Sequence, residues 1–256
     1  MNAITRIMVV IYALILREIR TTHGSSPIGY IWVLIKTLFQ ISIFWILREF
    51  LRAFTPPHGM TTLSFLACGF LVWHIFSETL QRTLHAVDAN KSLLVYPHVL
   101  PLEIVLARAT VVVATQIVSI GLILLLGIFL GYPVHITRPD LLMVALFLAL
   151  CLGIGCGFLG ATLVLFFPEM NNVIPMLLRI MFFLSGVFFS VTVFVHRFGS
   201  WLLLNPVLQC IEMMRTAMSV GYISPYFDMQ YLCMVNLAVM TLGLLLERFN
   251  HRRLRF

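Results

Sequence analysis

Residues 141–167 read LLMVALFLALCLGIGCGFLGATLVLFF, a run of 27 residues without a charged side chain. About 20 consecutive apolar residues suffice for an α-helix to cross the hydrocarbon core of a bilayer, so the run is predicted to be a transmembrane helix. It also spells G-x-G-x-x-G over Gly155–Gly160, but no strand, turn or acidic residue surrounds these glycines as in a dinucleotide-binding site. We expect them instead to let neighbouring helices approach closely.

The composition of the whole chain extends this interpretation. Of 256 residues, 61% are hydrophobic and only 11% are charged, whereas a soluble domain is roughly 45–50% apolar and about 25% charged. A soluble globular protein is therefore excluded, and so is a disordered chain, which requires low hydrophobicity. The five cysteines include no C-x-x-C pair and are expected to be small apolar residues inside helices. The predicted fold class is an all-α polytopic membrane protein.

Six segments are long and apolar enough to be predicted as spans. They are Tyr30–Leu47, Leu63–Leu80, Ile104–Leu130, Leu141–Phe167, Val173–Val195 and Met229–Leu246. Two apolar pieces around Asn205-Pro206 are too short to cross a bilayer and are expected to be external half-helices before the sixth span. The chain is treated as one transmembrane domain, 1–256, with an entry region 1–27, the spans within 28–247 and a basic tail 248–256.

The first hydrophobic stretch, Ile7–Leu16, is too short to span a bilayer. A signal peptide is a second interpretation, but Arg17, Glu18 and Arg20 follow where a small-residue cleavage site is required. On a helix, Arg6, Arg17 and Arg20 fall within an arc of about 60°. One basic stripe on an apolar helix predicts an amphipathic helix that lies on the membrane surface.

The net charge of +7 is attributed to membrane orientation, because Lys and Arg are enriched in cytoplasmic loops. If both termini are cytoplasmic, eleven basic residues lie inside and five lie outside. The inner set is Arg6, Arg17, Arg20, Arg82, Lys91, Arg108, Arg179, Arg248, Arg252, Arg253 and Arg255. The outer set is Arg48, Arg52, Arg138, Arg197 and Arg215. This asymmetry favours six spans with both ends in the cytoplasm.

Lys36 is the remaining basic residue and lies within the first predicted span. An intramembrane charge is costly and usually faces a polar interior, although a lysine six residues after Tyr30 can also snorkel to the interface. The aromatic residues of the first two spans also have two interpretations, as interface anchors or as the wall of a sugar pathway. The candidate pathway residues are Tyr30, Trp32, Lys36, Phe39, Trp45 and Trp73, with Arg48 and Arg52 at the exit.

The sequence contains no complete motif for nucleotide binding or hydrolysis. Gly24-x-x-x-x-Gly29 begins like a phosphate-binding loop, but Tyr30-Ile31 occupies the place of the required Lys-Ser/Thr pair. The histidines show no H-E-x-x-H spacing, and no Gly-x-Ser-x-Gly motif is present. We therefore expect no catalytic residue and no metal site in this chain, and any ATP must bind to another chain.

Several groups of residues follow one another in a familiar order. They are Arg17-Glu18-Ile19-Arg20 with Ile28-Gly29-Tyr30-Ile31-Trp32, Val87-Asp88-Ala89-Asn90 with Pro101 and Ala107-Arg108-Ala109, Phe167-Pro168-Glu169-Met170 with Ile174-Pro175, and Asn205-Pro206, Glu212 and Arg215 with Gly221-Tyr222-Ile223-Ser224. Together they resemble the polysaccharide permeases of type-2 ABC exporters, in particular the KpsM-type permeases of capsule export in Gram-negative bacteria. The resemblance covers nearly the whole chain.

This resemblance implies a homodimer of six-span subunits in the bacterial inner membrane, paired with separate ATPase subunits that bind ATP and Mg²⁺. It also implies periplasmic adaptor and outer-membrane partners and a lipid-linked, often acidic polysaccharide as substrate; nucleic acid is not expected. The predicted ATPase-coupling residues are Arg17, Glu18, Arg20, Val87, Asp88, Asn90, Lys91, Leu94, Tyr96 and Glu169. The predicted external gate consists of Asn205, Pro206, Glu212 and Arg215.

Two alternatives stay open. The first keeps the exporter but changes its cargo to O-antigen or teichoic-acid chains. The second is a membrane-embedded enzyme that acts on lipid-linked glycans. Such an enzyme needs a cluster of catalytic carboxylates or histidines, whereas the acidic residues here are scattered one or two to a loop.

Overall fold

The computed structural model describes residues 3–23, 35, 37–46, 60–89, 101–191, 195 and 199–251. Within these ranges every regular element is a helix, which confirms the predicted all-α fold class. Four of these helices are long and apolar enough to cross a membrane. They are α3 (Thr62–Leu84), α6 (Pro101–Phe129), α7 (Pro139–Phe166) and α11 (Met229–His251).

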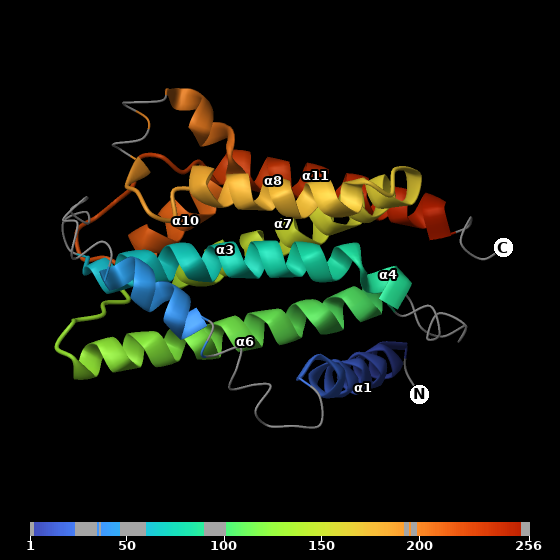
Figure 1. Ribbon diagram of the computed structural model, residues 1–256, viewed down its shortest axis with the longest axis horizontal. Coiled ribbons are helices and arrows are strands. Elements are labelled where there is room, and N and C mark those ends of the chain that lie inside the picture. Colours follow the sequence, from blue (N-terminus) through green and yellow to red (C-terminus); the bar gives the residue numbers. More distant parts are fainter. Residues whose placement is uncertain are drawn as a thin grey trace.

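Helix α3 lies at the centre of the structure, packed against α6, α7 and α10 (Pro206–Ala217) (Figure 1). In its apolar window 89% of the residues are buried, compared with 17% in α11. A helix that is apolar on all sides is typical of a buried position or a membrane span, so the exposed apolar side of α11 is suited to lipid. Burial, rather than hydropathy, therefore distinguishes the central helix from the peripheral ones.

The glycines of α7 allow this helix to contact two neighbours at once. A Cβ atom on Gly153 would lie 2.8 Å from the Phe76 carbonyl oxygen, and one on Gly157 would lie 2.9 Å from the Leu80 carbonyl oxygen, both in α3. On another face, a Cβ atom on Gly243 of α11 would lie 2.7 Å from the Gly155 carbonyl oxygen. The prediction that the glycine motif serves helix packing is confirmed, because small residues permit such close backbone approach.

The predicted spans differ from the structure at the fifth span. Helix α8 extends over Met170–Leu184, only 15 residues, and the chain then turns at Ser185 and Gly186, where φ is +71°. The prediction of a continuous span Val173–Val195 is therefore wrong in its second half. Within the first predicted span, the structure describes the apolar helical segment Thr37–Ile46.

The shorter elements agree better with the sequence. Two short helices precede α11, the 3₁₀ helix η1 (Ser200–Leu204) and α10, as predicted around Asn205-Pro206. Helix α1 (Ala3–His23) packs against α6, and the four-residue α4 (Ala86–Ala89) lies between the ends of α3 and α6. Helix α1 and the end of α11 lie at the same end of the molecule (Figure 1). All five cysteines are free, as expected.

The packing of α7 on α3 leads to a first prediction. Gly157→Ala should lower the midpoint of thermal unfolding of the detergent-purified protein, because the new Cβ would lie 2.4 Å from the Thr83 Cβ. The matched control is Gly121→Ala on α6, where a Cβ meets nothing within 4 Å. The control should be neutral or stabilising by up to about 1 kcal/mol, since alanine is the better helix former. Equal effects of the two substitutions would contradict the packing assigned to Gly157.

Candidate functional site

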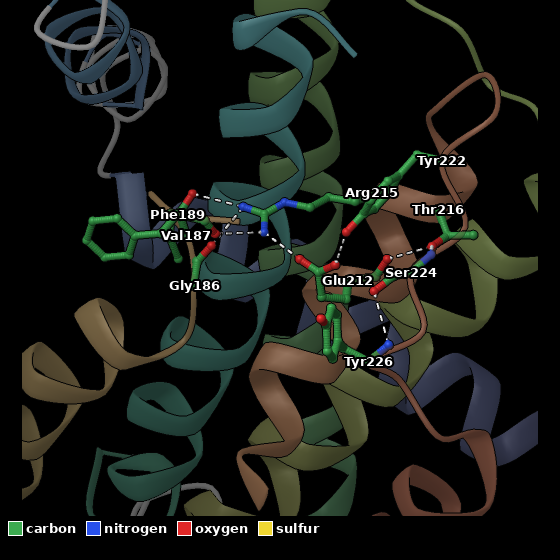
Figure 2. Close-up of polar contacts among 9 residues, drawn as sticks. All are labelled: Gly186, Val187, Phe189, Glu212, Arg215, Thr216, Tyr222, Ser224 and Tyr226. Carbon is green, nitrogen blue, oxygen red and sulfur yellow. Dashed lines mark hydrogen bonds and ion pairs between the residues drawn. The ribbon is translucent and has the colours of Figure 1, made fainter. Parts of the chain in front are cut away.

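A buried ion pair lies where α10 meets the end of α8 (Figure 2). Both Glu212 and Arg215 are completely inaccessible to solvent. The Arg215 Nη1 atom donates to Glu212 Oε1 at 2.7 Å and to the Phe189 carbonyl oxygen at 3.3 Å. Its Nη2 atom donates to the carbonyl oxygens of Gly186 at 2.8 Å and Val187 at 3.1 Å. One guanidinium thus binds a carboxylate and three backbone carbonyls.

This arrangement explains how the turn that follows α8 can lie inside an apolar environment. No irregular backbone is tolerated in hydrocarbon unless protein or water satisfies its polar groups. The Ser185 hydroxyl donates to the Met181 carbonyl oxygen at the end of α8, and Arg215 supplies donors to the carbonyl groups of the turn. The guanidinium carbon also lies 3.6 Å from the centre of the Phe65 ring in α3, which adds a cation–π contact.

The second carboxylate oxygen of Glu212 accepts a hydrogen bond from the Tyr222 hydroxyl at 2.7 Å. Burial and the neighbouring Glu212 carboxylate raise the pKa of Tyr222, so the phenol stays protonated and remains a donor. The Thr216 hydroxyl donates to the Glu212 carbonyl oxygen and accepts from the Ser224 amide. Both Glu212 carboxylate oxygens and both Arg215 Nη atoms thus have hydrogen-bond partners, as a buried ion pair requires.

Asn205 connects the same two elements at the start of α10. Its Oδ1 atom accepts from the Val207 amide at 3.0 Å and caps the helix, while its Nδ2 atom donates to the Ser185 hydroxyl at 3.0 Å. Pro206 occupies the first helical position, where its missing N–H costs nothing. The four residues predicted as an external gate thus lie in α10 or at its start, and two of them, Asn205 and Arg215, contact residues 185–189.

A second group of charges fastens α1 to the core. Glu18 Oε1 lies 3.1 Å from Arg82 Nη1 in α3, and Glu18 Oε2 lies 3.3 Å from Arg108 Nε in α6. The Arg108 Nη1 atom also donates to the Arg82 carbonyl oxygen at 3.0 Å. The three side chains are only 13–25% exposed. Arg82 and Arg108 were expected to mark the cytoplasmic side, and Arg108 to belong to a family motif; their contact with Glu18 was not predicted.

The other predicted coupling residues are distributed around this end of the structure. Arg17 is half-buried and Arg20 is exposed, both on α1, and Glu169 is exposed just before α8. The backbone of Val87 and Asp88 belongs to α4. Asn90, Lys91, Leu94 and Tyr96 lie outside the described residues. The described members are thus found on α1, on α4 and between α7 and α8.

Of the predicted pathway residues, Trp73 lines a cleft of about 350 Å³ between segment 37–46, α3 and α8. Phe39 is exposed, and Trp45 packs edge-on against Tyr132 with their ring centres 5.5 Å apart. Tyr30, Trp32, Lys36, Arg48 and Arg52 lie outside the described residues. The cleft also contains Gln40, Ser77, Gln81 and Arg179, which sequence reasoning did not select.

A further polar group lies within the span α3 itself. Glu78 Oε1 accepts from Gln116 Nε2 of α6 at 2.9 Å and lies 3.7 Å from His74 Nδ1. Glu78 falls inside the predicted span Leu63–Leu80. This interhelical contact joins α3 to α6 by a polar interaction in the middle of their apolar packing.

The sequence of the chain matches a known family over most of its length. Residues 9–219 match the ABC-2 type transporter family. The chain therefore belongs to the ABC-2 type transporter family, whose members are membrane subunits of ABC transporters.

Individual relatives agree with this assignment. The polysialic acid transport protein KpsM of Escherichia coli is 31% identical over 240 residues, which cover 94% of this chain and 93% of the relative. The capsule polysaccharide export inner-membrane protein CtrC of Neisseria meningitidis serogroup A is 25% identical, covering 94% and 91%. The O-antigen export system permease protein RfbA of Klebsiella pneumoniae is 22% identical, covering 94% and 90%.

The buried pair generates a second prediction. Arg215→Met should reduce the free energy of unfolding by about 3–5 kcal/mol, because it leaves the Glu212 carboxylate and three carbonyl groups without their donor. Glu212→Gln should cost less, since the glutamine still accepts hydrogen bonds. Thermal or denaturant unfolding in detergent measures both. The control is Arg138→Gln, which removes an exposed ion pair with Asp140 and should behave like the wild type.

Proposed function

We propose that this chain is the membrane permease of an ATP-driven exporter that moves lipid-linked capsular polysaccharide across the inner membrane. The observation that carries the proposal is similarity to a polysialic acid transport protein over 94% of the chain. A half-polar, aromatic-lined cleft between segment 37–46, α3 and α8 supports a carbohydrate cargo. Transport, rather than chemistry on the glycan, is the activity we assign to this chain.

The proposed topology has six spans with both termini in the cytoplasm. The described segment 37–46 and α8 would belong to the first and fifth spans, which complete the set with the four long helices. Arg82, Arg108 and Arg248 lie near the ends of α3, α6 and α11 that are close to α1, and a basic end favours the cytoplasmic side (Figure 1). Helix α1 would lie along that surface, and η1 and α10 at the external end.

The functional unit would be a homodimer with two ATPase subunits that bind ATP and Mg²⁺. Two apolar surfaces border the cleft and support pairing of two copies. One surface, on segment 35–46, exposes Ile35, Phe39, Ile43 and Ile46. The other, on α8, exposes Met176, Leu177 and Ile180. A second copy packed against these surfaces would place the two clefts on either side of a shared pathway. Periplasmic adaptor and outer-membrane proteins would then receive the polymer.

Coupling to the ATPase would occur at the end that carries α1 and α4. The Glu18 ion pairs would let α1, α3 and α6 move together when the ATPase pushes against Val87–Tyr96. Rigid elements that switch between two packings can transmit such motion. At the opposite end, α10 and its neighbours would form the external gate.

The function is tested by deleting the chain in the organism that encodes it and locating the glycan. A lipid-linked polysaccharide should accumulate in the cytoplasm and disappear from the cell surface, and re-expression should restore export. Co-purification should recover an ATPase subunit. A surface glycan that is unchanged by the deletion would contradict the proposal.

A second cargo follows from one specific observation, the 22% identity to an O-antigen export permease. The same deletion strain separates the two cargoes, because the glycan that accumulates is identified chemically. Purified protein that modified a lipid-linked glycan without any ATPase would instead support a membrane-embedded enzyme.

The Glu18 ion pairs generate a third prediction. Glu18→Gln should reduce ATP-dependent export by roughly two- to thirtyfold, the range of coupling lost when one residue of a connecting network is changed. Surface glycan is measured at equal levels of membrane-inserted protein. Asp140→Asn, which removes an exposed carboxylate at the other end of the molecule, is the control and should export normally. Normal export by the Glu18→Gln variant would contradict a role of α1 in coupling.

A further inference from the structure

The cleft between segment 37–46, α3 and α8 combines groups that differ in chemistry. Gln40, Ser77 and Gln81 provide amide and hydroxyl groups, Arg179 provides a guanidinium, and Trp73, Phe182 and Phe183 provide rings. Its volume of about 350 Å³ is within the range of small-ligand sites. A cleft that only accommodated lipid would have no need for two amides and a cation.

The aromatic wall is held in place by ring packing. The Trp73 ring lies 5.3 Å from that of Phe182 and 5.7 Å from that of Phe76, centre to centre. Phe183 contacts Phe182 at 5.5 Å but is itself 56% exposed, so one side of its ring is free for a ligand. Trp73 is only 6% exposed. The wall is thus a fixed surface with one accessible ring.

Arg179 is the most informative member of the cleft. Arg82 and Arg108 each contact the Glu18 carboxylate, and Arg215 contacts Glu212. No carboxylate in the described part of the chain lies within ion-pair distance of the exposed Arg179. The charge count assigned Arg179 to the cytoplasmic side, but it lies within the apolar helix α8, where an unpaired charge is costly and usually marks a ligand pathway. A guanidinium forms bidentate hydrogen bonds with carboxylates, which gives it geometric as well as charge selectivity.

We propose that this cleft binds one carboxylate-bearing sugar unit of the polymer, with Arg179 as the residue that selects acidic glycans. The Arg179 guanidinium donates to the sugar carboxylate, the exposed face of Phe183 packs against the apolar face of the pyranose ring, and the two amides bind hydroxyl groups. The proposal rests on the proposed function, because it assigns a place and a selective residue to that cargo. Arg179 would thus discriminate between charged and neutral polymers.

The test is oligosaccharide binding to the full-length chain, co-purified with its ATPase and reconstituted in lipid nanodiscs. The probes are a sialic acid hexamer, which carries carboxylates, and maltohexaose, which is neutral. Arg179→Gln should weaken binding of the acidic hexamer by roughly ten- to hundredfold, the loss of a charge-assisted pair, and leave maltohexaose binding unchanged. The affinity of Arg179→Lys for the acidic hexamer should lie between those of the wild type and Arg179→Gln, because lysine keeps the charge but not the planar pair of donors.

Two further variants separate this site from a structural role. Phe183→Leu should weaken both hexamers, since the ring contact does not depend on charge. Arg138→Gln is the matched control, an exposed arginine at the opposite end of the molecule, and should bind both hexamers like the wild type. Light scattering measures the assembly, because loss of the dimer in Arg179→Gln would show an inter-subunit contact and overturn the proposal.

Other outcomes are equally decisive. Unchanged affinity of Arg179→Gln for the acidic hexamer, or an equal loss for both hexamers, overturns the selective role of Arg179. Displacement of the hexamer by anionic phospholipid, but not by neutral lipid, would instead assign Arg179 to a lipid headgroup. Failure of any ATPase to co-purify counts against the proposed function, whereas an intact complex that binds neither hexamer counts against the cleft alone.

Discussion

The salt bridge between Glu212 and Arg215 is the interaction on which the arrangement of α10 and the turn after α8 depends. Helix α8 ends after 15 residues, too short to cross a bilayer, and the turn that follows it at Ser185–Val187 is buried. An apolar environment tolerates such an end only if donors are supplied. Arg215 supplies them to the turn, Glu212 compensates the Arg215 charge, and the Tyr222 hydroxyl donates to the second Glu212 oxygen. Without this network, neither the turn at Gly186 nor the position of α10 against α3 would be stable.

The glycines of α7 solve a different problem, which is packing without a hydrophobic driving force. In lipid, helices associate through close van der Waals contact and polar interactions between them, because the surrounding chains are as apolar as the helices. Gly153 and Gly157 bring α7 against α3, and Gly155 meets Gly243 of α11. Because α3 also contacts α10 and α6, these five helices form one close-packed group, whereas α1 and α8 make fewer contacts with it. The peripheral helices are therefore better suited to move.

Much of this could be predicted from the sequence, and the failures have a physical cause. A run of 27 uncharged residues determines α7, and Asn205-Pro206 marks the start of α10 because both residues are favoured at a helix N-terminus. The end of α8 was missed because the Arg215 side chain that makes it stable lies about 30 residues further along the chain. The Glu18 contacts and the cleft were missed for the same reason, since they join residues distant in sequence. The periodicity of apolar residues predicts which face of a helix is buried, but it does not predict which distant side chain forms an ion pair or hydrogen bond with a charged group.

Under the proposed function, helix α8 connects the cleft to the external gate. Arg179 faces the cleft within α8, and the residues that follow the end of the same helix are bound by Arg215 of α10. About six residues separate the two sites, less than two turns of helix. A movement of α8 large enough to admit a sugar unit would therefore displace either the carbonyl groups held by Arg215 or α10 itself. Because breaking a buried pair is costly, movement of α8 and α10 as one unit is favoured. Helix α8 would thus couple binding of a sugar unit in the cleft to movement of the gate.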